Sequence, residues 1–125
     1  MSDNWLGLQT HDGARPGETV MVFEGVLNAE TATRFRESVR KYESATLVVD
    51  MSRVRSVDSS GLGVLIGAYV SFERNCRQLL LAGLNDRIWE IFRTCKISDV
   101  FTRYPTVAAA EQAVIVDGED AVASA

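Results

Sequence analysis

Two adjacent serines, Ser59 and Ser60, stand where an apolar strand is expected to pass into a helix. The run 46–50 is β-prone and apolar, and apolar residues within 62–72 recur at steps of three and four, which predicts a helix. A helix start presents unpaired N–H groups and partial positive charge, which favour a phosphate. Two interpretations remain open. One serine caps the helix, or one accepts a phosphate that adds roughly −1.5 to −2 charge.

The glycines after these serines do not form a nucleotide-binding motif. Gly61 and Gly63 are followed by Gly67, whereas a dinucleotide-binding fingerprint needs its third glycine one residue earlier. The Gly-Lys-Ser/Thr sequence of a P-loop does not occur in the chain. We therefore predict that Gly67 allows close packing between the helix and the sheet.

The chain also lacks the residues that two further classes of protein, serine hydrolases and receiver domains, require. A serine hydrolase elbow needs glycine two residues before its serine, but Val57 and Asp58 occupy these positions, and His11 is the only histidine. A receiver domain is a closer competitor because Asp50 ends an apolar strand, yet the acid pair and the lysine that it requires are missing. Asp50 is predicted to bond to a loop. We expect no enzymatic activity, no cofactor and no metal.

Length and charge restrict the class of protein. A chain of 125 residues suffices for one domain, and a net charge of −4 argues against nucleic acid as a direct partner. No apolar run is long enough to cross a bilayer, and the N-terminus does not resemble a signal peptide, so a cytoplasmic protein without membrane insertion is expected. Cys76 and Cys95 are predicted to be reduced and mostly buried. The modest charge and the lack of an apolar stripe predict a monomer.

Periodicity and turn residues predict alternating strands and helices. The strands are expected at 5–10, 19–23, 46–50, 78–82 and from Val100 onward. The helices are expected to be opened by Asn28, by the serine motif, by Asn85 or Asp86, and by Pro105. Gly25 is expected to end the second strand, and residues 52–57 are expected to be a connector. Val70 is expected on the buried face of the second helix.

This order of elements predicts an α/β fold. Residues 1–116 should form a single domain with a mixed, mostly parallel central β-sheet and about four α-helices packed on it. The first two strands should pair antiparallel across a hairpin. Residues 117–125 are expected to be a frayed, disordered tail.

Residues 58–65, with the sequence DSSGLGVL, resemble the signature of the STAS domain in bacterial anti-sigma factor antagonists. Three further segments are similar to this family. Residues 23–28 resemble its turn before the first helix, residues 47–52 its Val-Leu-Asp-Leu-Ser strand, and residues 97–101 its Leu-Asp-x-Val-Phe segment. The resemblance runs from Val20 to about Val114 and implies one STAS domain.

The resemblance implies a regulatory function. Antagonists of this family bind an anti-sigma factor that is also a serine kinase, and a sigma factor is thereby released. The kinase phosphorylates the second serine of the motif, which corresponds to Ser60, and the complex dissociates. A PP2C-type phosphatase resets the switch. The expected partner-binding residues are Asn28, Asp58, Ser59, Ser60, Gly61 and Leu62.

Some positions depart from the family pattern or allow two interpretations. Asn28 replaces the usual Asp and so removes a negative charge near the switch. Lys96 replaces a common helix-ending glycine, which implies a different C-cap. Trp89 is expected either to pack on the last helix or to lie beside the docking surface. Arg53 and Arg55 are either solvated loop charges or groups that attract a phosphorylated loop or an ATP-bearing partner.

Two other functions within the family remain open. The chain could serve a partner-switching pathway whose output is not a sigma factor. It could also be a scaffold subunit of a lipid or anion transport complex, in which Ser60 only caps a helix.

Overall fold

The computed structural model describes residues 4–114, and the tail expected at 117–125 lies outside the described residues. Five strands and four helices alternate in the described part of the chain. In chain order they are β1 (Leu6–Asp12), β2 (Glu18–Leu27), α1 (Ala32–Arg40), β3 (Thr46–Val57), α2 (Ser59–Arg74), β4 (Gln78–Ala82), α3 (Asp86–Thr94), β5 (Arg103–Tyr104) and α4 (Val107–Gln112).

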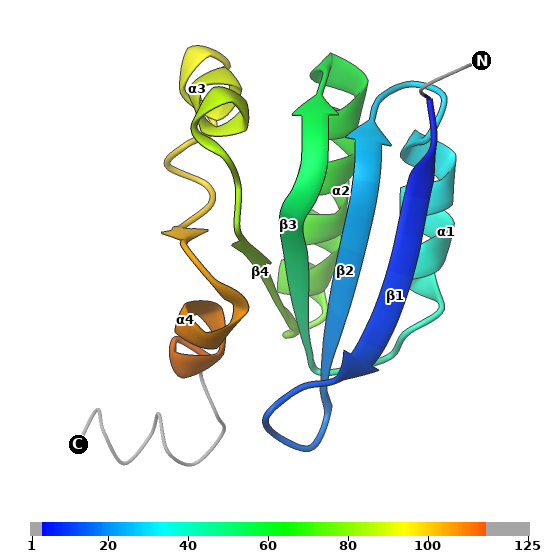
Figure 1. The fold of residues 1–125 in the computed structure, drawn as a ribbon. Helices are drawn as coiled ribbons and strands as arrows, with labels where there is room; N and C mark the ends of the chain where they lie inside the picture. Colours follow the sequence, from blue (N-terminus) through cyan, green and yellow to red (C-terminus); the bar gives the residue numbers. More distant parts are fainter. Residues whose placement is uncertain (1–3, 115–125) are drawn as a thin grey trace.

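The strands form one mixed sheet in the order β1-β2-β3-β4-β5 (Figure 1). β1 and β2 are an antiparallel hairpin, and the other neighbours pair parallel. The predicted α/β fold with a mostly parallel sheet and four helices is therefore confirmed. The parallel register pairs Leu27 with Val57, so β2 and β3 end together at one edge of the sheet. The residues that follow these two strands are thereby brought to the same place.

The alternation of side chains along β2 and β3 divides the core between the two faces of the sheet. Met21 and Val49 belong to the larger cluster, into which α1, α2 and α3 also place buried side chains. Val20 and Val48 point to the other face, where they pack with Ala110 of α4. In Figure 1 the helices α1 and α2 lie side by side behind the sheet. These two helices carry the surface described below.

Two expected boundaries within the sheet are wrong. β2 does not end at Gly25 but continues to Leu27, because Gly25 adopts a φ of +117° beside shifts in the β2–β3 register. Its lack of a side chain lets the Trp5 carbonyl approach, since a Cβ on Gly25 would lie 2.2 Å from that oxygen. The expected connector 52–57 is the second half of β3, in which Val54 and Val57 are buried.

Several expected positions also differ from the structure. Val70 is 40% exposed because α2 turns that side away from the sheet. Val100 lies in a turn, and the last strand pairs only from Arg103. Pro105 precedes Thr106, which is the N-cap of α4. Helix α4 therefore begins two residues later than Pro105, at Val107.

The prediction of buried cysteines is wrong, and both Cys76 and Cys95 are exposed free thiols. Cys95 is the C-cap of α3 and is followed by Lys96 at a φ of +60°. The Ile97 and Lys96 N–H groups donate to the carbonyls of Phe92 and Arg93, the two bonds of a Schellman motif. Lys96 therefore ends the helix as a glycine would, and the different C-cap that we expected is not found.

Candidate functional site

Asp58 begins the candidate site as the N-cap of α2. Its side-chain Oδ1 accepts a hydrogen bond of 2.9 Å from the backbone N–H of Gly61. Its own N–H donates to the carbonyl of Leu27 at 3.1 Å, which joins the end of β2 to the start of α2. The capping role that one of the serines could have had belongs to this aspartate.

Ser59 and Ser60 are the first two residues of α2, and both are exposed. Within residues 4–114 neither hydroxyl forms a hydrogen bond. The first N–H groups of a helix have no acceptor inside it and carry partial positive charge. Each hydroxyl is therefore exposed beside backbone N–H groups whose partial positive charge tolerates an added anion.

Gly61 and Leu62 lie beneath these serines and are buried. A Cβ on Gly61 would lie 2.3 Å from the Leu27 carbonyl oxygen, so only glycine allows α2 to approach β2 this closely. Leu62 is 3% exposed and belongs to the main core. These two residues therefore hold the helix start in place, while Asp58, Ser59 and Ser60 reach the surface.

Asn28 follows β2 at the same edge of the sheet as Asp58. Its Oδ1 accepts from the N–H groups of Glu30 at 3.0 Å and Thr31 at 3.2 Å. Helix α1 begins at Ala32, and Thr31 before it forms no side-chain cap hydrogen bond. The capping contacts come from Asn28, since its carbonyl accepts from the Ala32 N–H and its own N–H donates to the Thr31 hydroxyl. The predicted capping role of Asn28 is therefore found in the turn that leads into α1, and its Nδ2 donates to the side-chain oxygen of Asn4.

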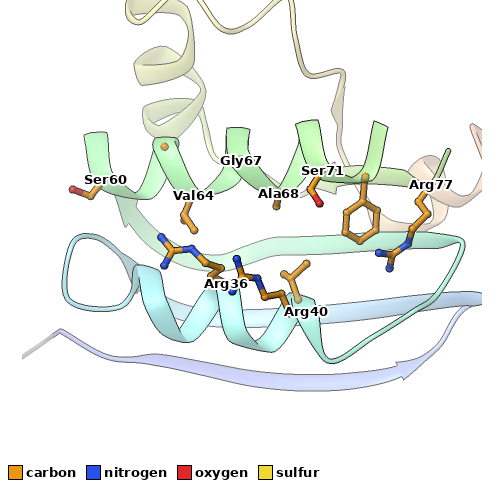
Figure 2. A pocket seen from close by; sticks show the side chains of 11 residues that line it. Arg36, Arg40, Ser60, Val64, Gly67, Ala68, Ser71 and Arg77 are labelled. Carbon is orange, nitrogen blue, oxygen red and sulfur yellow. The ribbon is translucent and has the colours of Figure 1, made fainter. Parts of the chain in front are cut away.

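A groove of about 450 Å³ separates α1 from α2 (Figure 2), and we call it the α1–α2 groove. Its α2 side includes Ser60, Gly63, Gly67 and Ser71, and its α1 side includes Arg36 and Arg40. A Cβ on Gly63 or on Gly67 would meet no atom within 4 Å. The predicted close packing at Gly67 is therefore wrong, and that glycine faces the open groove.

The two arginines of this groove were not predicted to be part of a site. Arg36 and Arg40 are four residues apart and share one face of α1, as charged residues on a solvated helix face often do. The sequence signal that could have indicated the groove is the series of small residues at 60, 63, 67 and 71, since small residues at this spacing leave one face of a helix open.

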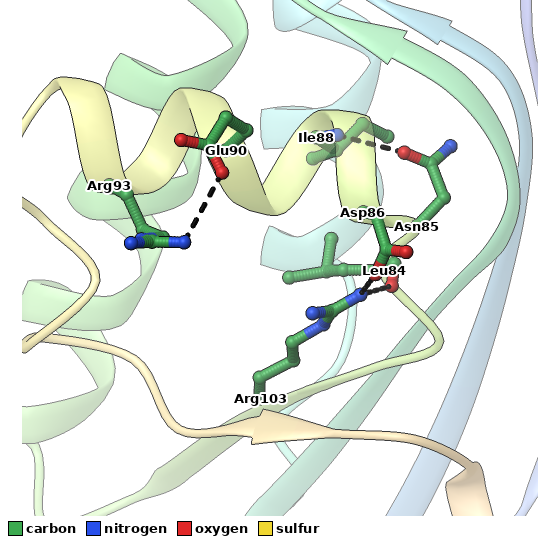
Figure 3. A network of polar contacts seen from close by, with 7 residues as sticks. All are labelled: Leu84, Asn85, Asp86, Ile88, Glu90, Arg93 and Arg103. Carbon is green, nitrogen blue, oxygen red and sulfur yellow. Dashed lines mark hydrogen bonds and ion pairs between the residues drawn. The ribbon is translucent and has the colours of Figure 1, made fainter.

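Asp86 and Arg103 belong to a separate polar network at the start of α3 (Figure 3). Arg103 donates to the carbonyl of Leu84 at 3.0 Å and pairs with Asp86 at 2.6 Å. Of the two caps predicted for α3, Asn85 and Asp86, it is Asn85 that accepts from the Ile88 N–H, at 2.8 Å. The Trp89 ring stacks on Phe92 and lies under the Arg103 guanidinium. This network ties the start of α3, and the loop that precedes it, to β5.

The arginines before the motif are surface residues of β3. Arg53 lies 4.0 Å from Glu24, and both side chains are more than half exposed, so this ion pair contributes little to stability. Arg55 is also exposed. Asp50 accepts a hydrogen bond of 2.9 Å from the Ser52 N–H, but it lies within β3 and not at the end of a strand.

Two carboxyl groups meet at the opposite end of the sheet. Glu18 and Glu111 each accept from the Ala14 N–H, at 2.7 and 2.6 Å. Burial, followed by the hydrogen bond with Glu111, raises the pKa of Glu18. The same hydrogen bond is the main reason why the pKa of Glu111 is lowered. Both carboxyl groups accept from the Ala14 N–H, and this arrangement fastens the β1–β2 hairpin to α4.

We expect Glu18→Gln to stabilise the protein at pH 8. Since the folded state raises the pKa of Glu18, its contribution to stability is complete below the unfolded pKa and is lost as the pH rises through the folded value. Glutamine keeps the shape of the side chain but carries no charge, so burial does not penalise it at high pH. Urea midpoints should be higher for the variant at pH 8, with the difference disappearing near pH 4.

The exposed Glu43→Gln is the control and should show no such pH dependence. Equal midpoints for Glu18→Gln and wild type at pH 8 would contradict the raised pKa of Glu18.

Within residues 4–114 no cluster of His, Cys, Asp and Glu could hold a metal ion. In the same range no helix is long and apolar enough to cross a membrane.

Comparison with known proteins places these features in a family. The sequence pattern of the STAS domain matches residues 8–110. The chain is 35% identical over 79 residues to a protein of Listeria monocytogenes named anti-sigma-B factor antagonist, covering 61% of this chain and 69% of that protein.

Two solved structures have a similar fold. An anti-sigma factor antagonist from Mycobacterium paratuberculosis superposes with a TM-score of 0.74 at 21% identity, over 90% of this chain and 97% of that one. A sulfate transporter family protein from Wolinella succinogenes superposes with a TM-score of 0.69 at 19% identity, over 79% of this chain and 85% of that one.

Proposed function

Because this chain belongs to the STAS domain family, we propose that it is an anti-sigma factor antagonist that phosphorylation of Ser60 switches off. In this function the protein is a cytoplasmic binding partner and a kinase substrate, and it catalyses no reaction itself. The name of the Listeria relative supports the general class of function. The phosphorylation step rests on the chemistry of the site.

The observation that carries this proposal is the division of roles between Asp58 and Ser60. Asp58 caps α2, so the Ser60 hydroxyl is not needed for the fold and lies exposed in the first helical turn. A phosphate there meets partial positive charge, a contribution of about 0.3–1 kcal/mol in its favour. Modification of Ser60 therefore leaves the folded state intact.

The same phosphate opposes docking. The unmodified protein binds an anti-sigma factor that is also a serine kinase, and a sigma factor is released. The kinase transfers the γ-phosphoryl group of ATP to the Ser60 Oγ, with release of ADP and a proton. Burying the resulting charge against a partner that offers no cation costs several kcal/mol. A change from 99% to 1% bound requires about 5.5 kcal/mol of differential binding, so this cost can supply much of the switch.

The remaining residues of the predicted docking surface have distinct roles in this proposal. Asp58 and Ser59 flank Ser60 on the surface and contact the partner. Asn28 lies at the same edge of the sheet and shapes the turn beside them. Gly61 and Leu62 act from below by fixing the start of α2. A PP2C-type phosphatase removes the phosphate and restores binding.

We expect Ser60 to gain a single phosphate when the protein is incubated with its partner kinase and ATP. Tandem mass spectrometry locates the modification. Ser59→Ala is the matched control, since it removes the neighbouring hydroxyl and should leave phosphate uptake unchanged, whereas Ser60→Ala should abolish it. Phosphate on Ser59, or none on either serine, would contradict the proposed switch.

A transport scaffold is the second candidate, favoured by the fold shared with the Wolinella sulfate transporter family protein. In that function the STAS domain binds a transport subunit, and Ser60 has no regulatory chemistry. The same kinase experiment separates the two functions, because a scaffold gains no phosphate at Ser60. Copurification with a transport subunit in place of a kinase would then assign the scaffold function.

A further inference from the structure

The α1–α2 groove contains four residues that the stability of the fold does not explain. Arg36 and Arg40 are like charges at an i, i+4 spacing, which destabilises a helix. Gly63 and Gly67 lie inside α2, where glycine is unfavourable, and neither is required by a close neighbour. All four line the same groove. The groove thus combines an open helix face with two adjacent cations.

The two cations are available to an anion. Neither Arg36 nor Arg40 forms a hydrogen bond or an ion pair with any residue in 4–114. No carboxylate is present among the described residues that line the groove. Arg77 at the far end is already engaged, because it donates to the carbonyls of Ser44 and Tyr42 and lies over the Phe72 ring. The positive charge nearest the open part of the groove is therefore uncompensated.

The position of Ser60 indicates which anion enters the α1–α2 groove, namely a phosphate carried by Ser60 itself. Figure 2 shows Ser60 at one end of the groove, followed in order by Arg36, Arg40 and Arg77. The Arg36 guanidinium lies between the two helices on the side of Ser60. A phosphate on Ser60 carries roughly two negative charges and three acceptor oxygens, which suit guanidinium donors.

We propose that the phosphate on Ser60 is bound by Arg36 of the same chain across the end of the α1–α2 groove, with Arg40 as a weaker second contact. This inference rests on the proposed function, which supplies the phosphoserine. The pair bridges α1 and α2 and covers the end of the groove next to the docking surface. Phosphorylation then not only adds charge but also removes the Arg36 cation from the surface that a partner meets.

The second pKa of the phosphoserine is a direct measure of this contact. We would install phosphoserine at position 60 by recoding its codon in the full chain, which needs no kinase, and titrate it by ³¹P NMR. Free phosphoserine has a second pKa of about 6, and a bound cation lowers this value. In the Arg36→Gln variant the midpoint should rise by about 0.5 pH unit, and in Arg40→Gln by less. The helix start acts equally in all variants, so it cannot produce this difference.

Arg74→Gln is the matched control, because Arg74 is exposed on α2 and does not line the groove. It should leave the midpoint unchanged. As a second readout, phosphorylation should raise the urea midpoint more in the wild-type chain than in Arg36→Gln. Equal ³¹P midpoints for wild type and Arg36→Gln would overturn the proposal, as would a larger shift in Arg40→Gln.

These outcomes are independent of the proposed function. If the partner kinase modifies Ser60 but Arg36→Gln leaves the titration unchanged, the switch stands and the intramolecular contact fails. If the titration shifts as expected but no kinase modifies Ser60, the contact is a property of the groove and the regulatory function fails.

Discussion

Gly61→Ala is expected to lower the free energy of unfolding by about 3 kcal/mol, the upper part of the range for an overpacked core. The added Cβ would lie 2.3 Å from the Leu27 carbonyl oxygen and 2.9 Å from its carbon, and both are backbone atoms of β2. Neither can move aside as a flexible side chain can. Helix α2 must therefore shift away from the sheet, and the Asp58 N–H bond to Leu27 is strained with it.

Gly63→Ala is the matched control for this prediction. It makes the same chemical change two residues later in α2, where a Cβ meets no atom within 4 Å. Replacing an unstrained helix glycine with alanine should stabilise the chain by about 0.5–1 kcal/mol. Urea denaturation followed by circular dichroism measures both variants. If Gly61→Ala proved as stable as wild type, the close approach of α2 to β2 could not be what fixes the position of Ser60.

Local sequence signals sufficed where an element depends on its own residues. The bounds of β4 and the Asn85 cap of α3 are confirmed because both follow from a short apolar run and from a polar residue at a helix start. The second half of β3 was not predicted, because it depends on a neighbouring strand and not on its own residues. Four of the six residues 52–57 are polar, and the segment becomes a strand only because β2 continues beside it past Gly25.

The candidate site also combines features that depend on local sequence with features that depend on the packing of distant elements. The junction of β3 and α2 is local, so the exposed position of Ser60 could be expected from the sequence. The capping role of Asp58 was not foreseen, since two serines beside it compete for that role by residue type alone. The α1–α2 groove depends on the packing of two helices against one sheet face, and spacing within a single helix does not reveal it.

Ser60→Asp is expected to weaken binding to the anti-sigma factor by about 100-fold, or ~2.7 kcal/mol, if the proposed function holds. The aspartate carries one negative charge where phosphoserine carries about two, so its effect should be smaller than that of phosphorylation. The side chain at position 60 is exposed, and the helix cap resides in Asp58, so the fold should be unaffected. Isothermal titration calorimetry with a non-hydrolysable ATP analogue measures the affinity without phosphorylation of the wild-type chain.

Ser60→Asn separates charge from shape in this measurement, because asparagine matches aspartate in size but is neutral. It should bind within a few-fold of wild type, and Ser60→Ala should bind as wild type does even with ATP present. If Asn and Asp weakened binding equally, the partner would be responding to the volume of the side chain, and phosphate would act as a steric block. If Asp bound as tightly as wild type, negative charge at the start of α2 could not be the signal, since an exposed carboxylate there already carries about half the charge of the phosphate.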